Sequence, residues 1–481
     1  MRKYPNNRRA GSALVWTVIV IALLSLGATE VLRLVTLKYQ VALQTATWQE
    51  ALLAAESGVD LAIAELRKGL YPAPNHAWEN WNNAPGDQVT SYTFTTLSNA
   101  GFAGTPMTIE ANVDAPAQLI DSANSWQYYR IRTVGTMPVP GVARVGDNKQ
   151  DNRLRKLSLR WERFTNGILV PHAVSAPQVS RRIEAIVRPV SSFTSAILSV
   201  GTLDLTNQNI VIDSYDSRDP TKSTNGLYDV AKRQQNGDIA TDGDIIDAGN
   251  AHIYGNVATN AGTVIGAANI TGDERTDFYQ EPIPIGAPTW LSVNPLPATV
   301  LNETTINASA TRGAPSSRYV LSTIGLSGNQ TLTIAGNPDG SPTYVEIEVM
   351  GDISVTGQAQ IVVQPGVNAT IYFNGNVDVS GKGIINSNNQ PGDLLMYGIQ
   401  PTGGTTPHVN LSGNAQLSAS VYAPGHNVSV TGGGSSGHVF GSIVGKTVVM
   451  TGVTNLHYDE ALSSVGLINN YEIVSWFEDN R

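Results

Sequence analysis

The 481-residue sequence contains no cysteine, and only 14% of its residues are charged. Without cysteine, disulfide bonds, thiolate nucleophiles and cysteine metal ligands are excluded. Glycine is abundant, with 46 residues, together with Asn, Ser, Thr and Val, a composition typical of short strands joined by tight turns. Because 41% of the residues are apolar, the chain can bury large cores, and the sequence predicts a mainly β protein of two or three domains.

Positive charge is scarce outside the N-terminus, and the net charge is −9. The first eleven residues hold no acid but include four basic residues, Arg2, Lys3, Arg8 and Arg9. The rest of the chain is therefore more acidic than the total suggests, which argues against a specific nucleic-acid-binding role.

Proline is absent between Pro5 and Pro72, and this interval predicts one long helix. Residues 12–29 carry no charge and would span about 27 Å as a helix. Since apolar residues continue to Val35, we expect a membrane span over residues 13–35. Basic residues before the span place the N-terminus in the cytoplasm, so the bulk of the chain would be periplasmic or on the cell surface. The helix would continue as an amphipathic stretch whose apolar face is formed by Val41, Thr45, Trp48, Leu52, Ala55, Val59, Ala62 and Leu66.

The N-terminal run "RRAGSALVWTVIVIALLSLGATEVL", followed by "ALLAAESGVDLAIAEL", resembles the PilX-like minor pilins and pilus-assembly proteins, which are relatives of the type IV pilins. The resemblance implies that a prepilin peptidase cuts after Gly11 and leaves Ser12 as the new N-terminus. Most major pilins carry Glu at the fifth mature position. Here Trp16 occupies it, so the carboxylate that registers subunits in a pilus is missing.

Residues 72–189 show the hydrophobic period of two that is typical of strands. Five strands are expected, in "SYTFTTLS", "MTIEANV", "WQYYRIRTV", "LRKLSLRWER" and "SRRIEAIVRP". In the third, Ile131 alternates with Arg130 and Arg132, so one face of the predicted antiparallel sheet is apolar and the other basic. The apolar face needs a cover, which the amphipathic half of the helix can supply. The basic face could bind a polyanion, but a plain solvated face is the simpler interpretation.

The second half of the chain contains a repeat that is typical of a solenoid. Five copies share the form apolar, any, apolar, hydroxyl, glycine and read "ISVTG", "VDVSG", "VNLSG", "VSVTG" and "VVMTG". Intervals of 24, 32, 19 and 20 residues separate their glycines, which are Gly357, Gly381, Gly413, Gly432 and Gly452. A weaker copy, "LTIAG", ends at Gly336. Glycine permits the positive φ that a corner requires, and the hydroxyl before it can bond the turn backbone.

A recurrence near twenty residues predicts a right-handed parallel β-helix over about residues 198–457. The third residue of each copy would point inward, in a column formed by Val355, Val379, Leu411, Val430 and Met450. The second would point outward, in a column formed by Ser354, Asp378, Asn410, Ser429 and Val449. The proline-rich stretch "FYQEPIPIGAPTWLSVNPLP" would be an excursion across the surface. The final "YEIVSWFEDNR" is expected to rejoin the membrane-proximal sheet as a strand.

The predicted organisation has five parts. A basic leader covers residues 1–11, and the transmembrane and amphipathic helix covers residues 12–70. A pilin-like sheet domain follows over residues 71–195, then the β-helix over residues 196–460 and a C-terminal strand or tail over residues 461–481. With its stretches "IDSYDSRD", "GNAHIYGNVAT" and "NLHYDEAL", the β-helix region also resembles the uncharacterised repeat domain found behind PilX-like N-termini.

Right-handed β-helices often cleave or bind polysaccharides, which calls for a search for catalytic residues. Pectate-lyase-like sites use an arginine as base, and none occurs between Arg318 and Arg481. A glycosidase needs two carboxylates roughly 5–10 Å apart. Asp352 and Asp378 occupy different positions within the repeat, so they are not expected to share a face. We therefore expect no catalytic site.

Oxygen-rich loops suit calcium, and Asp213, Asp216 and Asp219 in "DSYDSRD" are the candidates for it. Their spacing matches no strong calcium motif, and Asx turns explain it better. No cofactor is expected beyond this weak calcium candidate.

The remaining polar candidates have simpler structural interpretations. His438 in "GHVFGS" is expected in a turn or on the surface. His457 and Asp459 have metal-compatible chemistry, but two residues at this spacing fit a closing turn better. Glu56 and Asp60 lie one helical turn apart and are expected to be solvated.

These patterns predict a structural protein rather than an enzyme. We expect a bacterial inner-membrane, pilin-like protein, a minor component or assembly factor of a type IV pilus or related secretion fibre, that displays its β-helix as an adhesion or scaffold module. Its partners would be the membrane, the prepilin peptidase, pilin-like subunits or assembly machinery, and extracellular polysaccharide. Two alternatives stay open: a surface polysaccharide-binding or polysaccharide-cleaving β-helix protein, and a β-helix scaffold that polymerises without a pilus.

Overall fold

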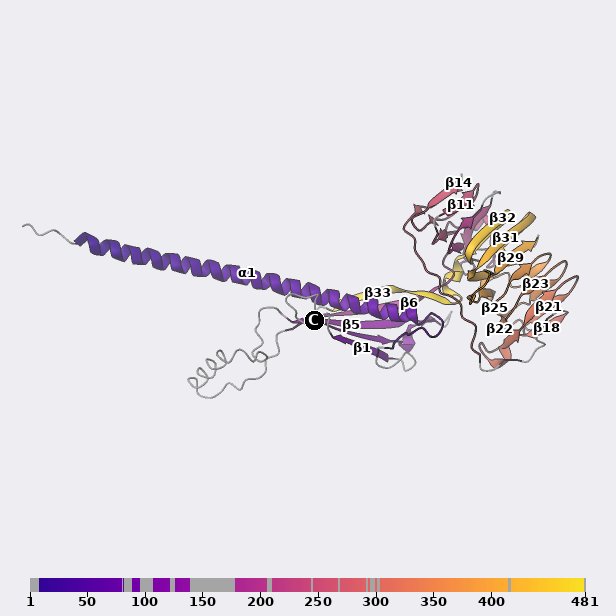
Figure 1. Ribbon diagram of the computed structural model, residues 1–481, viewed down its shortest axis with the longest axis horizontal. Coiled ribbons are helices and arrows are strands. Elements are labelled where there is room, and N and C mark those ends of the chain that lie inside the picture. The colour runs from indigo at the N-terminus through magenta and orange to yellow at the C-terminus, as the bar shows by residue number, and fades with distance from the viewer. Residues whose placement is uncertain are drawn as a thin grey trace, which may run out of the picture.

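A long helix, a small sheet and a large body of strands follow one another along the molecule (Figure 1). The computed structural model describes residues 8–79, 81, 89–95, 107–121, 126–138, 178–205, 210–243, 245–266, 269–290, 293–294, 299–300, 303–413 and 417–479. The sheet lies beside the C-terminal half of the helix, and the body lies beyond the end of that helix (Figure 1). The chain therefore has one long apolar helix and a strand-rich remainder.

Helix α1 (Arg8–Lys68) is an uninterrupted helix of 61 residues. Every described side chain from Val15 to Val41 is exposed, which leaves this half of the helix apolar on all sides. The segment Val15–Lys68 is long and apolar enough to cross a membrane by length and composition. The helix is thus compatible with a membrane anchor or a signal sequence.

The sheet beside α1 is antiparallel. Its strands are, in spatial order, β1 (Val89–Thr95), β2 (Thr108–Asp114), β5 (Tyr129–Pro138), β6 (Gln178–Ser191) and β33 (Ile468–Asp479). A separate ladder joins β3 (Ile120–Asp121) to β4 (Trp126–Gln127). The predicted strand "LRKLSLRWER" lies outside the described residues. The prediction that the C-terminal segment rejoins this sheet is confirmed, because β33 pairs with β6.

The apolar side of the sheet is covered by α1, as the sequence predicts. On the predicted apolar face of α1, the residues from Ala55 onward are buried. Val41 and Thr45 are exposed because they precede the part of α1 that contacts the sheet. The packing is close: Thr133 Oγ1 donates to the carbonyl oxygen of Ala55 at 2.8 Å. A Cβ added at Gly135 would lie 2.1 Å from the Ala51 carbonyl oxygen, so only glycine permits this approach.

The opposite face of the sheet is basic in sequence but largely neutralised in the fold. Arg130 forms an ion pair with Asp114, and Arg132 pairs with Glu184 at 3.0 Å. Arg188 on β6 pairs with a glutamate on the neighbouring β33. Because these pairs join adjacent strands, the three arginines are neutralised within the sheet, which supports the solvated-face interpretation for the described part of this face.

The body consists of strands that pair in parallel in three columns. The first column contains β19 (Arg318–Leu321), β22 (Thr343–Val349), β25 (Val367–Phe373), β28 (Leu394–Gly398), β31 (Ser420–Phe440), β32 (Ile443–Asp459), β7 (Ile197–Ser199), β10 (Ile239–Thr241), β13 (Val257–Ala258) and β16 (Glu274–Arg275). The second contains β17 (Thr299–Val300), β20 (Thr323–Leu326), β23 (Ile353–Val355), β26 (Val377–Val379), β29 (His408–Gly413), β31, β32, β8 (Leu203–Asp204), β11 (Ile245–Gly249) and β14 (Thr263–Gly266).

The third column has two stretches. One contains β18 (Thr304–Asn307), β21 (Thr331–Ala335), β24 (Gln360–Val363) and β27 (Gly383–Asn386), and the other contains β30 (Leu417–Ser418), β31, β32, β9 (Val211–Tyr215), β12 (His252–Ile253) and β15 (Asn269–Ile270). The long strands β31 and β32 run through all three columns. Short 3-10 helices occur at η2 (Ala117–Leu119), η3 (Val230–Lys232), η4 (Pro315–Ser317), η5 (Pro391–Asp393) and η6 (Glu460–Ser464).

The stacking order of the body differs from its order along the chain. Strands β7, β8 and β9 pair on one side with β32 and on the other with β10, β11 and β12. The chain therefore enters the stack in its middle, builds outward to β16, crosses to β17 at the far end and returns to β32. Both ends of the body then join β6 and β33, so the whole body is inserted between two adjacent strands of the small sheet.

The five predicted repeat copies stack in register. Ile353, Val377, Val409, Val428 and Val448 are paired one to the next in the second column. The predicted inward column is buried, and the predicted outward column is half-buried, at the positions listed from the sequence. Hydroxyls beside the corners bond to the previous strand, as when Ser412 Oγ donates to the Val379 carbonyl oxygen at 3.2 Å. The register of the repeat is thus confirmed.

The prediction that the weaker copy belongs to the same repeat is wrong. "LTIAG" forms β21, which belongs to the third column and pairs with β18 and β24. The strand that stacks on Ile353 is β20, whose sequence from Ile324 to Gly328 has the same form, apolar, any, apolar, hydroxyl, glycine. Its interval of 29 residues to Gly357 hid it from a search near twenty.

A second repeat, of glycine followed by Asp or Asn, marks another corner. The backbone N–H of Asn256 donates to Asp238 Oδ1 at 2.7 Å, and Asp273 N–H donates to Asn256 Oδ1 at 2.9 Å. Further along the stack, Asn376 N–H donates to Asp352 Oδ1 at 2.7 Å. Each side chain thereby satisfies the backbone of the next turn of the stack. The pattern is visible in the sequence at intervals of 17, 18 and 24 residues.

The predicted proline-rich excursion connects β16 to β17. Its described residues form neither helix nor strand, apart from a bridge between Ile285 and Ile399. Asn294 N–H donates to the Arg318 carbonyl oxygen at 2.8 Å, which fixes the excursion beside β19. Ile283 and Ile285 are buried, and Ile285 belongs to the core of the body, so the described part of the excursion does not lie wholly on the surface as predicted.

Candidate functional site

A chain of hydrogen-bonded side chains lies where β32 stacks on β9. Asp213 and His457 are both buried, and His457 Nδ1 lies 2.5 Å from Asp213 Oδ1. His457 Nε2 lies 2.9 Å from Nδ1 of the half-buried His438 on β31. Strand register brings them together, because Phe440, His457 and Asp213 are paired one to the next across three strands. We call Asp213, His457 and His438 the histidine relay.

The histidine relay is covered by residues 216–238, here called the cover segment. Tyr228 Oη donates to Asp213 Oδ2 at 2.6 Å, and its ring stacks on His457 with 3.8 Å between centroids. Burial, together with the nearby Asp213 carboxylate, raises the pKa of Tyr228 well above its usual range. The segment is also tied down at its start, where Lys222 Nζ lies 2.9 Å from Glu460 Oε2.

One arrangement of protons satisfies the relay with neutral imidazoles. His438 Nδ1–H donates to His457 Nε2, and His457 Nδ1–H donates to Asp213, so each donor is directed toward the buried carboxylate. Burial and the neighbouring His457 lower the pKa of His438. The relay can hold or pass a proton, but among the described residues no serine or threonine hydroxyl is hydrogen-bonded to His438.

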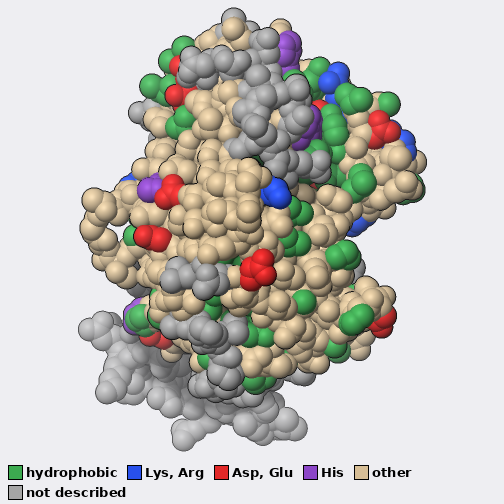
Figure 2. Space-filling model, turned by 90° about the vertical axis from the view of Figure 1, so that its right-hand side faces the viewer, with side chains coloured by type: hydrophobic (Ala, Val, Ile, Leu, Met, Phe, Trp, Pro, Cys, Tyr) green, Lys and Arg blue, Asp and Glu red, His purple; other side chains and the backbone are tan. Residues whose placement is uncertain are grey.

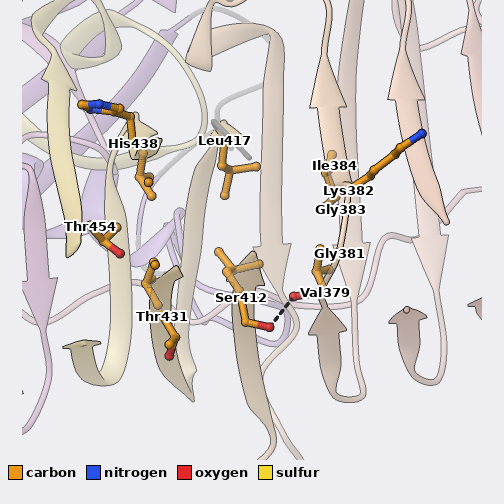
Figure 3. A pocket seen from close by; sticks show the side chains of 15 residues that line it. Val379, Gly381, Lys382, Gly383, Ile384, Ser412, Leu417, Thr431, His438 and Thr454 are labelled. Atoms are coloured by element: carbon orange, nitrogen blue, oxygen red, sulfur yellow. Dashed lines mark hydrogen bonds between the residues drawn. The ribbon is translucent and has the colours of Figure 1, made fainter. Parts of the chain in front are cut away.

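A cavity of about 50 Å³ lies beside the relay at the glycine corner of the body. Gly381, Leu417, Ser412 and Thr431 line it, together with His438. The imidazole of His438 points away from the space between the other lining residues (Figure 3). The cavity has room for a few water molecules.

The calcium candidates do not converge. Asp213 is turned inward to the relay, whereas Asp216 Oδ1 accepts from Arg218 N–H at 3.0 Å. Asp219 Oδ1 accepts from Thr221 N–H at 2.8 Å, which is an Asx turn. Within the described parts of the chain, no group of three or more His, Asp or Glu side chains could hold a metal ion.

The structure corrects two of the histidine predictions. His438 is not in a turn but in the interior of β31, and His457 is a buried strand residue rather than part of a closing turn. Asp459 does lie at a turn, where it caps the start of η6. Its Oδ1 accepts from Ala461 N–H at 3.1 Å and also from Ser217 N–H at 3.0 Å. Burial raises the pKa of Asp459.

The other residues singled out from the sequence do not belong to the histidine relay. Gly11 and Ser12 lie within α1. Asp60 is exposed and Glu56 half-buried on α1, in keeping with solvated acids. The two acids of the repeat do not meet: Asp352 accepts from the Asn376 N–H, whereas Asp378 accepts from His408 Nε2 at 3.1 Å and from Asn410 Nδ2 at 2.9 Å.

Asp393 on η5 gives the fold a pH dependence. Burial, with a smaller contribution from Asp459, raises the pKa of Asp393 from 3.8 to about 6. Between these values the folded chain holds a proton that the unfolded chain has lost, so the free energy of unfolding falls as pH rises from about 4 to about 6. Asp393→Asn should remove this loss, so its free energy of unfolding should gain about 2–3 kcal/mol relative to wild type between pH 4 and pH 7. Urea unfolding at both pH values measures it.

Asp339→Asn is the matched control for this pH dependence. Hydrogen bonds from Ser341 lower the pKa of Asp339, so its contribution is complete above pH 4 and the variant should not gain on wild type between pH 4 and pH 7. If the Asp393→Asn and wild-type stabilities change in parallel over this range, the assignment to Asp393 is wrong.

Sequence reasoning missed Tyr228 and the partnership of Asp213 with His457. These two relay residues are 244 positions apart, and Tyr228 sits in a stretch without a repeat. The one available signal is that Asp213 and His457 each follow an apolar strand residue, Ile212 and Leu456, at equivalent positions.

Comparison with known proteins identifies one matching family model, described as a domain of unknown function (DUF7305), over residues 318–465. This match runs from the start of β19 to just beyond η6 and leaves out α1, all five strands of the small sheet and the strands from β7 to β18. No curated protein and no solved structure matches the chain.

Proposed function

We propose that this chain is a membrane-anchored, pilin-like structural protein of a bacterial inner membrane, a minor component or assembly factor of a type IV pilus or related secretion fibre. The observation that carries the proposal is α1: one helix is apolar and exposed on all sides in its first half and packs on an antiparallel sheet in its second. The first half suits a bilayer, and the second holds a folded domain at its surface. The proposal puts the N-terminus in the cytoplasm, and the four basic residues of the leader support this orientation.

We further propose that the three parallel columns form a right-handed parallel β-helix that serves as an adhesion or scaffold module. The support is the regular pairing of each strand with the third strand along the chain. Stacked turns of this kind bury a continuous apolar core and present a long outer surface. The face turned away from α1 shows mostly backbone and uncharged polar side chains, with few basic residues (Figure 2).

The connection between sheet and body supports a display role. The chain passes between the sheet and the body twice. Hydrogen bonds of aromatic residues stabilise both connections: Tyr458 Oη donates to the Phe193 carbonyl oxygen at 2.9 Å, and Leu467 N–H donates to Tyr397 Oη at 3.0 Å. A body held by two packed connections keeps its orientation to the anchor better than one on a single linker.

N-terminal processing tests the pilin-like proposal. Protein purified from its native membrane should begin at Ser12, as seen by intact mass and N-terminal sequencing. Gly11→Val should abolish the cleavage, because the resemblance implies a peptidase that cuts after a glycine. Gly27→Val is the control, since a Cβ at Gly27 meets nothing within 4 Å and this variant should be processed normally. An intact Met1 in the wild type would refute the pilin-like assignment and leave a permanent membrane anchor.

A further inference from the structure

Strand β22 presents two carboxylates on the outer face of the body. Thr343, Val345, Ile347 and Val349 are buried, so the alternate residues Tyr344, Glu346 and Glu348 face outward and are half-buried. At about 3.3 Å per residue, Glu346 and Glu348 lie roughly 7 Å apart along the strand. Sequence reasoning examined Asp352 and Asp378 and overlooked this pair.

The two carboxylates have different surroundings. Glu346 Oε2 lies 3.0 Å from Arg318 Nε on the neighbouring β19. Among the described residues, no Lys, Arg or His nitrogen lies within 4.0 Å of Glu348. Its neighbours in the strand register are Val320 and Tyr372. Glu348 is thus an acceptor whose oxygens are not committed to an ion pair.

Aromatic rings flank these carboxylates. Trp290 comes from the excursion between β16 and β17 and meets Tyr372 on β25 edge to face, with 6.1 Å between centroids. The Arg318 guanidinium lies 5.7 Å from the Trp290 ring centre, and Tyr344 is packed against Arg312 at 4.8 Å. All three rings are half-buried, so each is held in place while part of its surface reaches solvent.

We propose that Trp290, Tyr344, Glu346, Glu348 and Tyr372 form a binding surface for a neutral or amino saccharide. The aromatic surfaces suit the apolar C–H faces of sugar rings, and the carboxylates accept hydrogen bonds from sugar hydroxyl or ammonium groups. Two acids with a single paired arginine disfavour carboxylated or sulfated glycans. The proposal rests on the adhesion role given above and names its ligand class.

A glycan microarray of neutral, amino and acidic glycans tests the surface, with the full chain in detergent micelles as the probe. At least one neutral or amino glycan should be retained. In titration calorimetry with that glycan, Trp290→Ala and Glu348→Gln should each weaken binding at least tenfold. Because Trp290→Ala removes a contact that fastens the excursion, Glu348→Gln is the variant expected to keep the fold unchanged, and thermal unfolding checks this.

Matched controls use the same residue types elsewhere. Trp476→Ala on β33 and Glu274→Gln on β16 replace exposed residues and should bind like wild type. The proposal is overturned if no neutral or amino glycan is retained, if only acidic glycans are, or if Glu348→Gln binds as well as wild type. Any of these results leaves processing at Gly11 unaffected, so failure here and failure of the pilin-like assignment are told apart.

Discussion

Gly381→Ala is expected to destabilise the protein by about 3 kcal/mol or more. Gly381 has a φ of +71°, and a Cβ there would lie 1.7 Å from the Gly357 carbonyl oxygen of the previous turn of the stack. The clash is with backbone, which cannot move without separating paired strands. Thermal or urea unfolding of the full chain in detergent, followed by circular dichroism, measures the loss.

Gly328→Ala separates the two contributions to this destabilisation, which are the clash with the backbone and the left-handed backbone conformation. Gly328 lies at the same corner of the repeat with a φ of +61°, but a Cβ there meets nothing within 4 Å. This control carries only the penalty for a left-handed backbone, about 1–2 kcal/mol. Equal losses for the two variants would show that the stacked turns are not packed as closely as the structure has them.

Asp213→Ala is expected to cost about 2–5 kcal/mol and to release the cover segment. The substitution leaves two buried donors without their acceptor, His457 Nδ1–H and the Tyr228 hydroxyl. Because Tyr228 fastens residues 216–238 through this carboxylate, amide hydrogen exchange in that segment should accelerate well beyond that in α1.

The matched control is Asp219→Ala, which removes a carboxylate that only closes the turn at Thr221. Its effect on the free energy of unfolding should be small, without faster exchange around His457. Should Asp213→Ala leave exchange in the cover segment unchanged, the histidine relay would have no part in holding that segment.

Much of the fold was accessible from sequence because its signals are local. The long helix follows from the absence of proline and the apolar run, and the inward column from Val355 to Met450 follows from the alternation of each repeat copy. The weaker copy at Gly336 failed for the same reason: a short apolar strand followed by glycine looks alike in every column. The column to which a strand belongs is indicated by its interval from the neighbouring copies rather than by its motif. Insertions between strands change these intervals and so hide the assignment.

The candidate sites were less accessible. The histidine relay depends on the pairing of β32 with β9, which no repeat interval indicates, because these two strands lie far apart in the sequence. The carboxylates Glu346 and Glu348 were visible as alternate residues, but Trp290 reaches them from an excursion whose path is not periodic. Sites built from one strand can be read locally, whereas sites shared between distant segments cannot.

By itself the sequence determined the apolar helix, the strand-rich body, the register of the five repeat copies and the return of the C-terminal strand to the small sheet. Only the tertiary structure decided that the body is inserted between β6 and β33 and that β7, β8 and β9 lie in the middle of the stack. The physical reason is that a parallel strand accepts any neighbour with matching alternation. The sequence therefore predicts which side chains of a strand are buried. Which strand pairs with which depends instead on the lengths of the connecting segments.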